Sequence, residues 1–302
     1  MPDFQHILVA TDFSPRASFA VERGAQLAHK HKATLHLLHV MDKLLLQMFG
    51  RVLVEHPLVT EERFYESAKA RLKGLADGLS DHYSVSVQHQ VNIGRAHERI
   101  ADYARSHAVD LTVLGTHGEN FVRDLFIGTT ALKFLRKGTH PALIVQSEVT
   151  EAYRGVLVAV DFSNVSRIAV EAAARIAPHA SVNVLHVYEV AFEGKMRYAG
   201  VEEGVIEQYR AAAAQEARRM MIDFLAGIEG GVRMSPLVRH GHAARTILDQ
   251  AQALRADLIV MGKRGMSELD ELLLGSVTKH VLFEIDRDVL LVAPSAAPTS
   301  RI

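Results

Sequence analysis

Two glycine loops of matching spacing are the residues in this chain that are best suited to do chemistry. The pattern G-x2-G-x9-G-[ST] begins at Gly115 and recurs 147 residues later at Gly262. Each copy follows a short apolar run, Leu111–Leu114 or Leu258–Met261, and precedes a segment with helical periodicity. Glycine lets backbone N–H groups approach an anion closely, and a helix N-terminus offers unpaired donors and a positive dipole end. Both patterns therefore predict a cradle for phosphate groups.

The two loops belong to two copies of one longer sequence. The segment HILVATDFS, which begins at His6, aligns with GVLVAVDFS, which begins at Gly155. Similarity continues through the second strand and the glycine loop of each copy, so the 302-residue chain is a duplication. We expect one domain over residues 1–148 and a second over residues 152–296.

Strands alternate with helices in each copy, which is typical of a parallel sheet covered on both faces. Ligands of such sheets bind beyond the C-terminal strand ends, where the winding direction reverses. We therefore expect Asp12, at the end of the first strand, to face the same space as the first glycine loop, and Asp161 to do so in the second copy. In the first copy the predicted strands are Ile7–Ala10, Thr34–Val40, Ser84–Val91, Leu111–Leu114 and Ala142–Gln146, and the predicted helices are Arg16–Lys30, Glu61–Leu79, Ala96–His107 and Thr130–Arg136.

Composition argues against several classes of function. A net charge of −1 gives no support for binding to nucleic acid or to an anionic membrane. No apolar stretch is long enough to span a bilayer, and the N-terminus, which enters a strand at Ile7, lacks the features of a signal peptide. The absence of cysteine excludes disulfides and thiolate metal sites. We expect a cytoplasmic protein.

The motifs of several enzyme classes are missing from the sequence. Neither G-x-x-x-x-G-K-[ST], G-x-G-x-x-G nor G-x-S-x-G occurs, which argues against a P-loop nucleotidase, a dinucleotide dehydrogenase and a nucleophile-elbow hydrolase. The candidate site has phosphate donors and one carboxylate per copy but no general base, so we predict no catalytic residue. His39 and His186 recur in both copies, and we interpret them as packed, hydrogen-bonded side chains. No metal site is predicted.

These residues resemble the universal stress protein family in its tandem two-domain form, over essentially the whole chain. The resemblance rests on the A-x-D-x-S strand ends (Ala10–Ser14 and Ala159–Ser163), the L-H-V second strands and the repeated glycine pattern. Family members with this pattern typically bind ATP, whereas members without it often do not. The resemblance implies an α/β fold of two tandem doubly wound five-stranded parallel sheets, in strand order 3-2-1-4-5 and adenine nucleotide alpha hydrolase-like. It also implies an internal pseudo-dimer through the last strands, Ala142–Gln146 and Val289–Ala293.

By position, the resemblance implies one nucleotide site in each copy, for ATP, or ADP or AMP, with Mg²⁺. The aspartate and a valine backbone would contact adenine, and the glycine loop would wrap ribose and phosphates. The basic pair Lys263 and Arg264 suits phosphate charge better than Thr116 and His117 do, unless both basic side chains point into solvent. The implied residues are Asp12, Val40, Gly115, Gly118, Gly128, Thr129 and Thr130 in the first copy, and Asp161, Val187, Gly262, Gly265, Gly275, Ser276 and Val277 in the second.

The expected function is that of an ATP-binding, nucleotide-dependent stress-response or regulatory module with an unidentified protein partner. No nucleic-acid or membrane partner is expected. One alternative is a nucleotide-free interaction or structural protein, which degenerate glycine loops would favour. Another is a slow ATPase, which a positioned base or a second carboxylate would favour. The sequence leaves open the number of occupied sites, a homodimer, and whether the apolar segment 41–60 packs over strand ends or contacts a partner chain.

Overall fold

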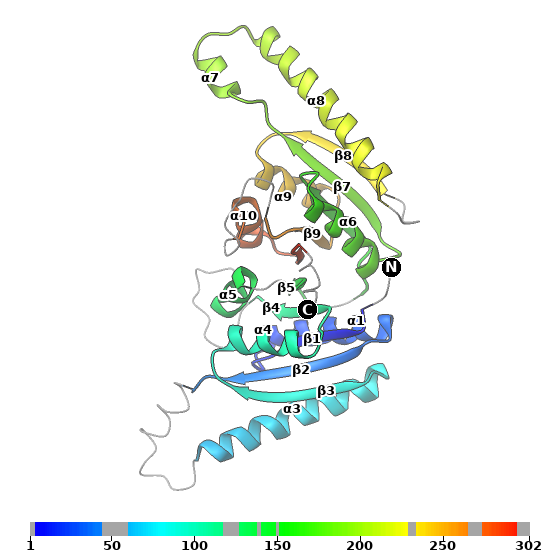
Figure 1. The fold of residues 1–302 in the computed structure, drawn as a ribbon, viewed down its shortest axis with the longest axis vertical. Coiled ribbons are helices and arrows are strands. Elements are labelled where there is room, and N and C mark those ends of the chain that lie inside the picture. Colours follow the sequence, from blue (N-terminus) through cyan, green and yellow to red (C-terminus); the bar gives the residue numbers. More distant parts are fainter. Residues whose placement is uncertain are drawn as a thin grey trace, which may run out of the picture. The chain divides into compact units, whose positions relative to one another are not determined.

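The computed structural model describes residues 4–43, 60–116, 127–137, 140–148, 151–228, 234–264 and 274–294. These residues form two compact units, which are divided along the chain between Glu151 and Ala152 (Figure 1). Most of the apolar segment 41–60, from residue 44 to residue 59, lies outside the described residues, so the prediction for that segment is not tested.

Unit 1 alternates strands and helices, as its sequence predicts. Its strands are β1 (His6–Ala10), β2 (Thr34–Met41), β3 (Val87–Ile93), β4 (Leu111–Gly115) and β5 (Ala142–Val145). Its helices are α1 (Pro15–His31), α3 (Glu61–Tyr83), α4 (Ala96–Ser106) and α5 (Thr129–Lys137).

Unit 2 repeats the pattern, and its described residues include a short helix after the second strand. Its strands are β6 (Gly155–Val160), β7 (Ser181–Tyr188), β8 (Met234–His240), β9 (Leu258–Gly262) and β10 (Asp288–Val292). Its helices are α6 (Asn164–Ile176), α7 (Glu193–Tyr198), α8 (Glu203–Ala226), α9 (Ala243–Ala253) and α10 (Ser276–Glu284).

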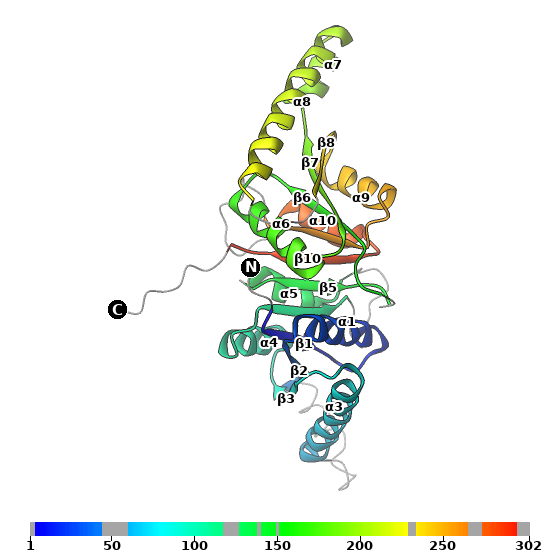
Figure 2. The ribbon, with the colours of Figure 1, turned by 90° about the vertical axis from the view of Figure 1, so that its right-hand side faces the viewer.

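Each unit contains a five-stranded parallel sheet with the predicted strand order. The order is β3-β2-β1-β4-β5 in unit 1 and β8-β7-β6-β9-β10 in unit 2, and both correspond to 3-2-1-4-5. The direction of winding therefore reverses between β1 and β4 in unit 1, and between β6 and β9 in unit 2. In unit 1, α1 and α3 cover one face of the sheet and α4 and α5 the other (Figure 2). The predicted fold class is confirmed.

The core follows from the apolar runs of the central strands. β4 and β9 are each buried at every residue except the terminal glycine. Strands that are covered on both faces read as continuous apolar runs rather than as alternating patterns. β3 alternates poorly and is mostly exposed, because it is an edge strand with helical cover on one side only.

Local signals explain where α1 begins and why β3 starts late. The side chain of Ser14 accepts a hydrogen bond from the N–H of Ala17, and Pro15 occupies the first turn, so the predicted start of α1 is confirmed. The strand predicted to begin at Ser84 instead begins at Val87. Ser84 caps α3 in the left-handed conformation, at φ 53°, and therefore cannot start a strand.

Candidate functional site

The C-terminal edge of each sheet brings the predicted aspartate next to the start of the predicted glycine loop. β1 and β4 are neighbours and pair Ala10 with Leu114, so the chain leaves the sheet side by side at Asp12 and Gly115. In unit 2 the equivalent pairing of β6 with β9 places Asp161 beside the second glycine loop. The predicted neighbour relation is confirmed in both units.

The first glycine of each loop packs closely against its surroundings, which are the start of α1 in unit 1 and the loop itself and the start of α6 in unit 2. A Cβ atom on Gly115 would lie 3.3 Å from the carbonyl oxygen of Arg16, in the first turn of α1. A Cβ atom on Gly262 would lie 2.9 Å from the carbonyl oxygen of Arg264 and 3.0 Å from Cγ1 of Val165, in the first turn of α6. A side chain at Gly262 would force its neighbours to shift, and one at Gly115 would need them to give by a few tenths of an ångström, so a larger residue at either position would disturb local packing as well as any ligand.

The third glycine of each loop closes the loop through its backbone. The N–H of Gly128 donates to the carbonyl oxygen of Thr116, and the N–H of Gly275 donates to that of Lys263 over 2.9 Å. The two units thus close their loops through the same hydrogen bond. The amide of the third glycine therefore holds the loop rather than a ligand, a role that the sequence pattern does not reveal.

Backbone N–H groups that have no acceptor inside the helix follow each closure. In α5 the helical hydrogen bonds begin with the N–H of Leu132, so the N–H groups of Thr129 and Thr130 have no acceptor inside the helix. In α10 the helical hydrogen bonds begin with the N–H of Lys279, so the N–H of Val277 likewise has no acceptor inside the helix. Such a helix start attracts anions. The predicted residues at these starts are Gly128, Thr129 and Thr130 in unit 1 and Gly275, Ser276 and Val277 in unit 2, whereas Gly118 and Gly265 lie outside the described residues.

The backbone of Val40 faces the space beyond the end of β1. In β2 the even-numbered residues bond toward β1, because the N–H of Thr11 donates to the carbonyl oxygen of Leu38 over 2.9 Å. Odd-numbered residues bond toward β3, as the N–H of Gly94 does to the carbonyl oxygen of Met41. Val40 therefore presents its N–H and C=O on the β1 side, past the last paired residue of that strand.

Unit 2 repeats this arrangement at Val187. The N–H of Gly241 donates to the carbonyl oxygen of Tyr188, so even-numbered residues of β7 face β8 and odd-numbered residues face β6. The pairing of β6 with β7 ends at His186. Val187 is the next residue, and its C=O lies on the β6 side, past the last paired residue and beside the strand end from which Asp161 emerges. The two predicted adenine contacts of each unit thus lie on adjacent strand ends.

Both aspartates form a tight turn before the next helix. Oδ1 of Asp12 accepts a hydrogen bond from the N–H of Ser14 over 3.0 Å, and Oδ1 of Asp161 accepts one from the N–H of Ser163 over 3.1 Å. In unit 2 the hydroxyl of Ser166 also donates to Oδ1 of Asp161 over 2.7 Å. These bonds fix the direction of each carboxylate and leave room for a second role of the same group.

His39 and His186 are hydrogen-bonded within the fold, as expected. Nδ1 of His39 lies 2.8 Å from the carbonyl oxygen of Thr11, and Nδ1 of His186 lies 2.9 Å from that of Val160. A carbonyl oxygen can only accept, so Nδ1 carries the hydrogen in both rings. Over the part of the chain that the structure describes, no group of three or more histidine, aspartate or glutamate side chains could hold a metal ion.

The sequence left open whether the side chain of Lys263 points into solvent. In the structure it does not. Its side chain is 5% exposed, and its counterpart Thr116 is buried as well. Burial lowers the pKa of the Lys263 ammonium from 10.5 to about 7, and the positive charge of Arg264 acts in the same direction. At neutral pH this lysine is therefore only partly charged. Burial does not decide whether the basic pair suits phosphate better than Thr116 and His117 do, because a phosphate nearby would raise this pKa again, so that expectation stays a prediction.

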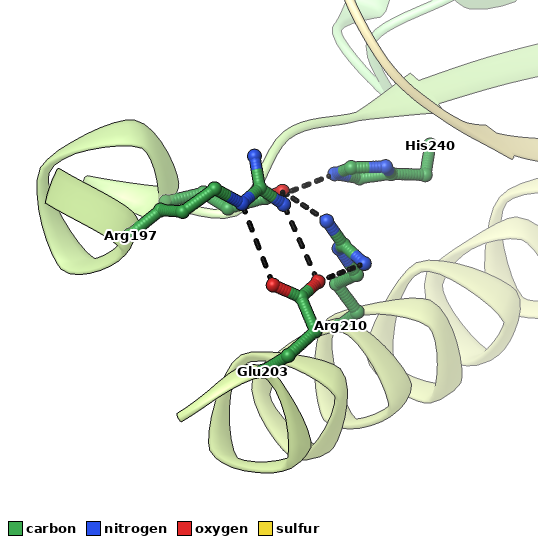
Figure 3. A network of polar contacts seen from close by, with 5 residues as sticks. Arg197, Glu203, Arg210 and His240 are labelled. Carbon is green, nitrogen blue, oxygen red and sulfur yellow. Dashed lines mark hydrogen bonds and ion pairs between the residues drawn. The ribbon is translucent and has the colours of Figure 1, made fainter. Parts of the chain in front are cut away.

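A network of ion pairs fixes α7 beside the ends of β7 and β8 in unit 2. Glu193 contacts Arg210 of α8 and His240 at the end of β8, and Arg197 and Arg210 both contact Glu203 (Figure 3). Hydrogen bonding from Arg210 is the main reason that the pKa of Glu193 falls to about 2. The network holds the connection after β7 in one position at the edge where Val187 lies. None of these contacts could be read from the sequence pattern.

Each half of the chain matches one known family. The model of the universal stress protein family matches residues 3–146 and again residues 152–293. The chain belongs to this family. The order of strands and the helix-start loops described above are thus those of a tandem universal stress protein. Among the residues that the structure describes, no helix is long and apolar enough to cross a membrane.

Similar universal stress proteins occur in distant organisms. One from Mycolicibacterium smegmatis is 24% identical over 300 residues, which cover 95% of this chain and 97% of that protein. YxiE of Bacillus subtilis is 32% identical over 135 residues, which cover 43% of this chain and 91% of YxiE. The crystal structure of a universal stress protein from Archaeoglobus fulgidus has a TM-score of 0.67 at 18% identity, covering 95% of this chain and 98% of that chain. The last likeness shows the shared fold.

Proposed function

We propose that this universal stress protein binds an adenine nucleotide, ATP with Mg²⁺, in one or both units and acts as a nucleotide-dependent stress-response module. The observation that carries the proposal is one constellation that occurs twice. A closed glycine loop ends at a helix start, and a fixed aspartate and a backbone edge lie on the neighbouring strand ends. A chance arrangement of packing glycines would not require the other two parts to recur with it.

The chemistry of these groups fits the parts of ATP. Backbone N–H groups at the start of α5 and α10 suit phosphate oxygens, because they offer donors without the cost of burying a side-chain charge. Adenine presents an amino donor and ring-nitrogen acceptors, which suit the N–H and C=O of Val40, the C=O of Val187 and the carboxylate of Asp12 or Asp161. Mg²⁺ bound mainly through the phosphates is consistent with this donor set, since Mg²⁺ needs few protein ligands there.

Binding without a catalytic role is the form of the proposal that these residues support. Each helix start supplies donors, and the aspartate beside it is already engaged in its turn. The bound nucleotide would alter the surface that a protein partner meets, since the loop and the strand ends lie at one edge of the sheet. A nucleotide-free interaction protein is the alternative that the following test separates from it.

The test places one negative charge at each helix start. Thr130→Glu and Val277→Glu put a carboxylate where a phosphate is proposed, and Thr130→Gln and Val277→Gln are controls of equal size without the charge. A carboxylate at a helix N-terminus stabilises the helix by about 0.3–1 kcal/mol, so the Glu variants should keep or raise the melting temperature. We expect titration calorimetry to show ATP affinity reduced by about tenfold or more in the Glu variants only. Equal affinity in the Glu and Gln variants would contradict the proposal.

A further inference from the structure

A histidine and a phenylalanine pack together at the end of the first strand in both units. In unit 1 the ring centroids of His39 and Phe13 are 4.5 Å apart, with planes inclined by 34°. In unit 2 the rings of His186 and Phe162 are 4.2 Å apart and inclined by 33°. The duplication has thus kept both the contact and its geometry, together with the D-F-S and L-H-V segments that carry it.

The phenylalanine of each pair is held in an unfavourable backbone conformation. Phe13 has φ 64° and Phe162 has φ 65°, in the left-handed region that bulky residues rarely adopt. Such a conformation costs about 1–3 kcal/mol and persists only where surrounding contacts hold it. A glycine at either position would avoid this cost. The phenylalanine ring must therefore contribute something that glycine cannot.

A side chain from a helix also contacts each phenylalanine ring. In unit 1 the guanidinium of Arg71, on α3, lies 4.4 Å from the centre of the Phe13 ring. In unit 2 the ring of Phe224, on α8, meets Phe162 edge-on at 5.5 Å. The two units use different side chains from equivalent helices for the same purpose. Each phenylalanine ring thus contacts both a histidine of the second strand and a side chain of a helix.

Each histidine joins the two segments that carry the predicted adenine contacts. His39 precedes Val40 in β2, and its Nδ1–H donates to the carbonyl oxygen of Thr11 over 2.8 Å. The imidazole of His39 thus holds Thr11 by a hydrogen bond and Phe13 by ring packing. Asp12 lies between these two residues. The arrangement recurs at His186, whose Nδ1–H donates to the carbonyl oxygen of Val160 over 2.9 Å. One imidazole therefore sets the separation between the aspartate and the valine backbone.

We propose that His39 and His186 are positioning residues for nucleotide recognition, each holding an aspartate and a valine backbone at the separation that selects adenine. This inference rests on the proposed nucleotide binding. A purely structural histidine would contribute to stability alone and would affect all nucleotides equally. A positioning histidine affects the choice of base, because guanine presents a carbonyl where adenine presents an amino group.

The test compares two replacements of His39 that separate packing from hydrogen bonding. His39→Leu keeps apolar volume but removes the donor, whereas His39→Asn retains a side-chain N–H at the same number of bonds from Cα as Nδ1. Both are made in the Val277→Glu background, so that binding at unit 1 is measured, and the mirror experiment uses His186 with Thr130→Glu. His89→Leu, an exposed position on β3, is the matched control.

The measured quantities are the dissociation constants for ATP and GTP, with the melting temperature recorded for every variant. We expect His39→Leu to lower the preference for ATP over GTP by about tenfold, in line with the loss of one well-placed hydrogen bond. His39→Asn should recover most of that preference, and His89→Leu should match the parent. If the Leu variant does not fold, the Asn variant and the two His186 variants still measure the preference.

Two results would overturn this inference. An unchanged ratio of ATP to GTP affinity in the Leu variants would show that the histidines have no part in base selection. A parallel loss of affinity for both nucleotides, without recovery by asparagine, would assign them a structural role only. A parent protein that binds neither nucleotide would instead refute the proposed function itself, which separates the two failures.

Discussion

Acidification should weaken unit 1 through one buried histidine. His36 in β2 is 2% exposed, and its two ring nitrogens lie 3.1 Å from Nδ1 of His6 and 3.1 Å from the hydroxyl of Tyr103. Burial, followed by the nearby rings of His6 and His107, lowers the pKa of His36 from 6.5 to about 4. Because the unfolded chain binds a proton that the folded chain excludes, stability is present above pH 6.5 and is lost as the pH falls toward 4.

The size of the effect follows from the pKa shift. A pKa lowered from 6.5 to about 4 corresponds to about 3 kcal/mol once both states are protonated. About 2 kcal/mol of this is lost between pH 7.5 and pH 5, since the folded state still excludes the proton over that interval. The equivalent position in unit 2 is Asn183, which does not titrate, so unit 2 lacks this contribution.

Hydrogen exchange at the two pH values measures the effect in each unit separately. The variant His36→Asn carries the residue of unit 2 and removes the titrating group. After correction for intrinsic exchange, peptides from β1 and β2 of the parent should lose about 30-fold more protection between pH 7.5 and pH 5 than those of the variant. Burial also lowers the pKa of His186 in β7, so peptides from β6 and β7 serve as the internal control for the substitution: their loss of protection should be the same in parent and variant. An equal loss of protection in parent and variant would refute the reasoning.

Two further predictions concern unit 2. Because burial lowers the pKa of Lys263 to about 7, phosphate binding nearby should raise it again, and ATP binding at pH 7 should take up a fraction of a proton. Calorimetry in two buffers of different ionisation enthalpy measures this proton uptake. The variant Lys263→Thr, which carries the residue of Thr116 in unit 1, should abolish the uptake. Identical binding enthalpies for the parent in both buffers would rule the uptake out. The hydroxyl of Tyr153 donates to Oδ2 of the buried Asp288 over 2.6 Å. Tyr153→Phe should lower the free energy of unfolding of unit 2 by about 1–3 kcal/mol in urea unfolding, because the buried carboxylate of Asp288 loses a donor. An unchanged unfolding midpoint would mean that the carboxylate is satisfied without this hydroxyl.

The sequence predicts the fold because period and repetition are strong physical signals. Short, largely apolar runs such as Leu111–Leu114 and Leu258–Met261 favour strands that are covered on both faces, and they lie within β4 and β9. Strand ends are predicted less well. The start of β3 depends on one left-handed residue, Ser84, for which serine gives no warning. The packing of the two domains as an internal pseudo-dimer stays a prediction.

In the candidate site, too, local features could be predicted from the sequence, whereas contacts between distant segments could not. The aspartates, valines and helix starts lie where the motifs place them, because strand ends and glycine loops are local features. The burial of Lys263, the strained backbone of Phe13 and the network around Glu193 depend on contacts between segments far apart in the sequence. No pattern within one segment carries that information. Binding of a nucleotide by any of these residues stays a prediction.

Quantification of the nucleotide that the purified protein carries tests the central claim most directly. The protein is purified without added nucleotide and denatured, and the released small molecules are measured by mass spectrometry per mole of chain. The proposal predicts one to two adenine nucleotides per chain, or the same occupancy after incubation with ATP and Mg²⁺. The variants Thr130→Glu and Val277→Glu should each remove the share of one unit. A chain that carries no nucleotide, and takes up none from ATP and Mg²⁺, would contradict the account.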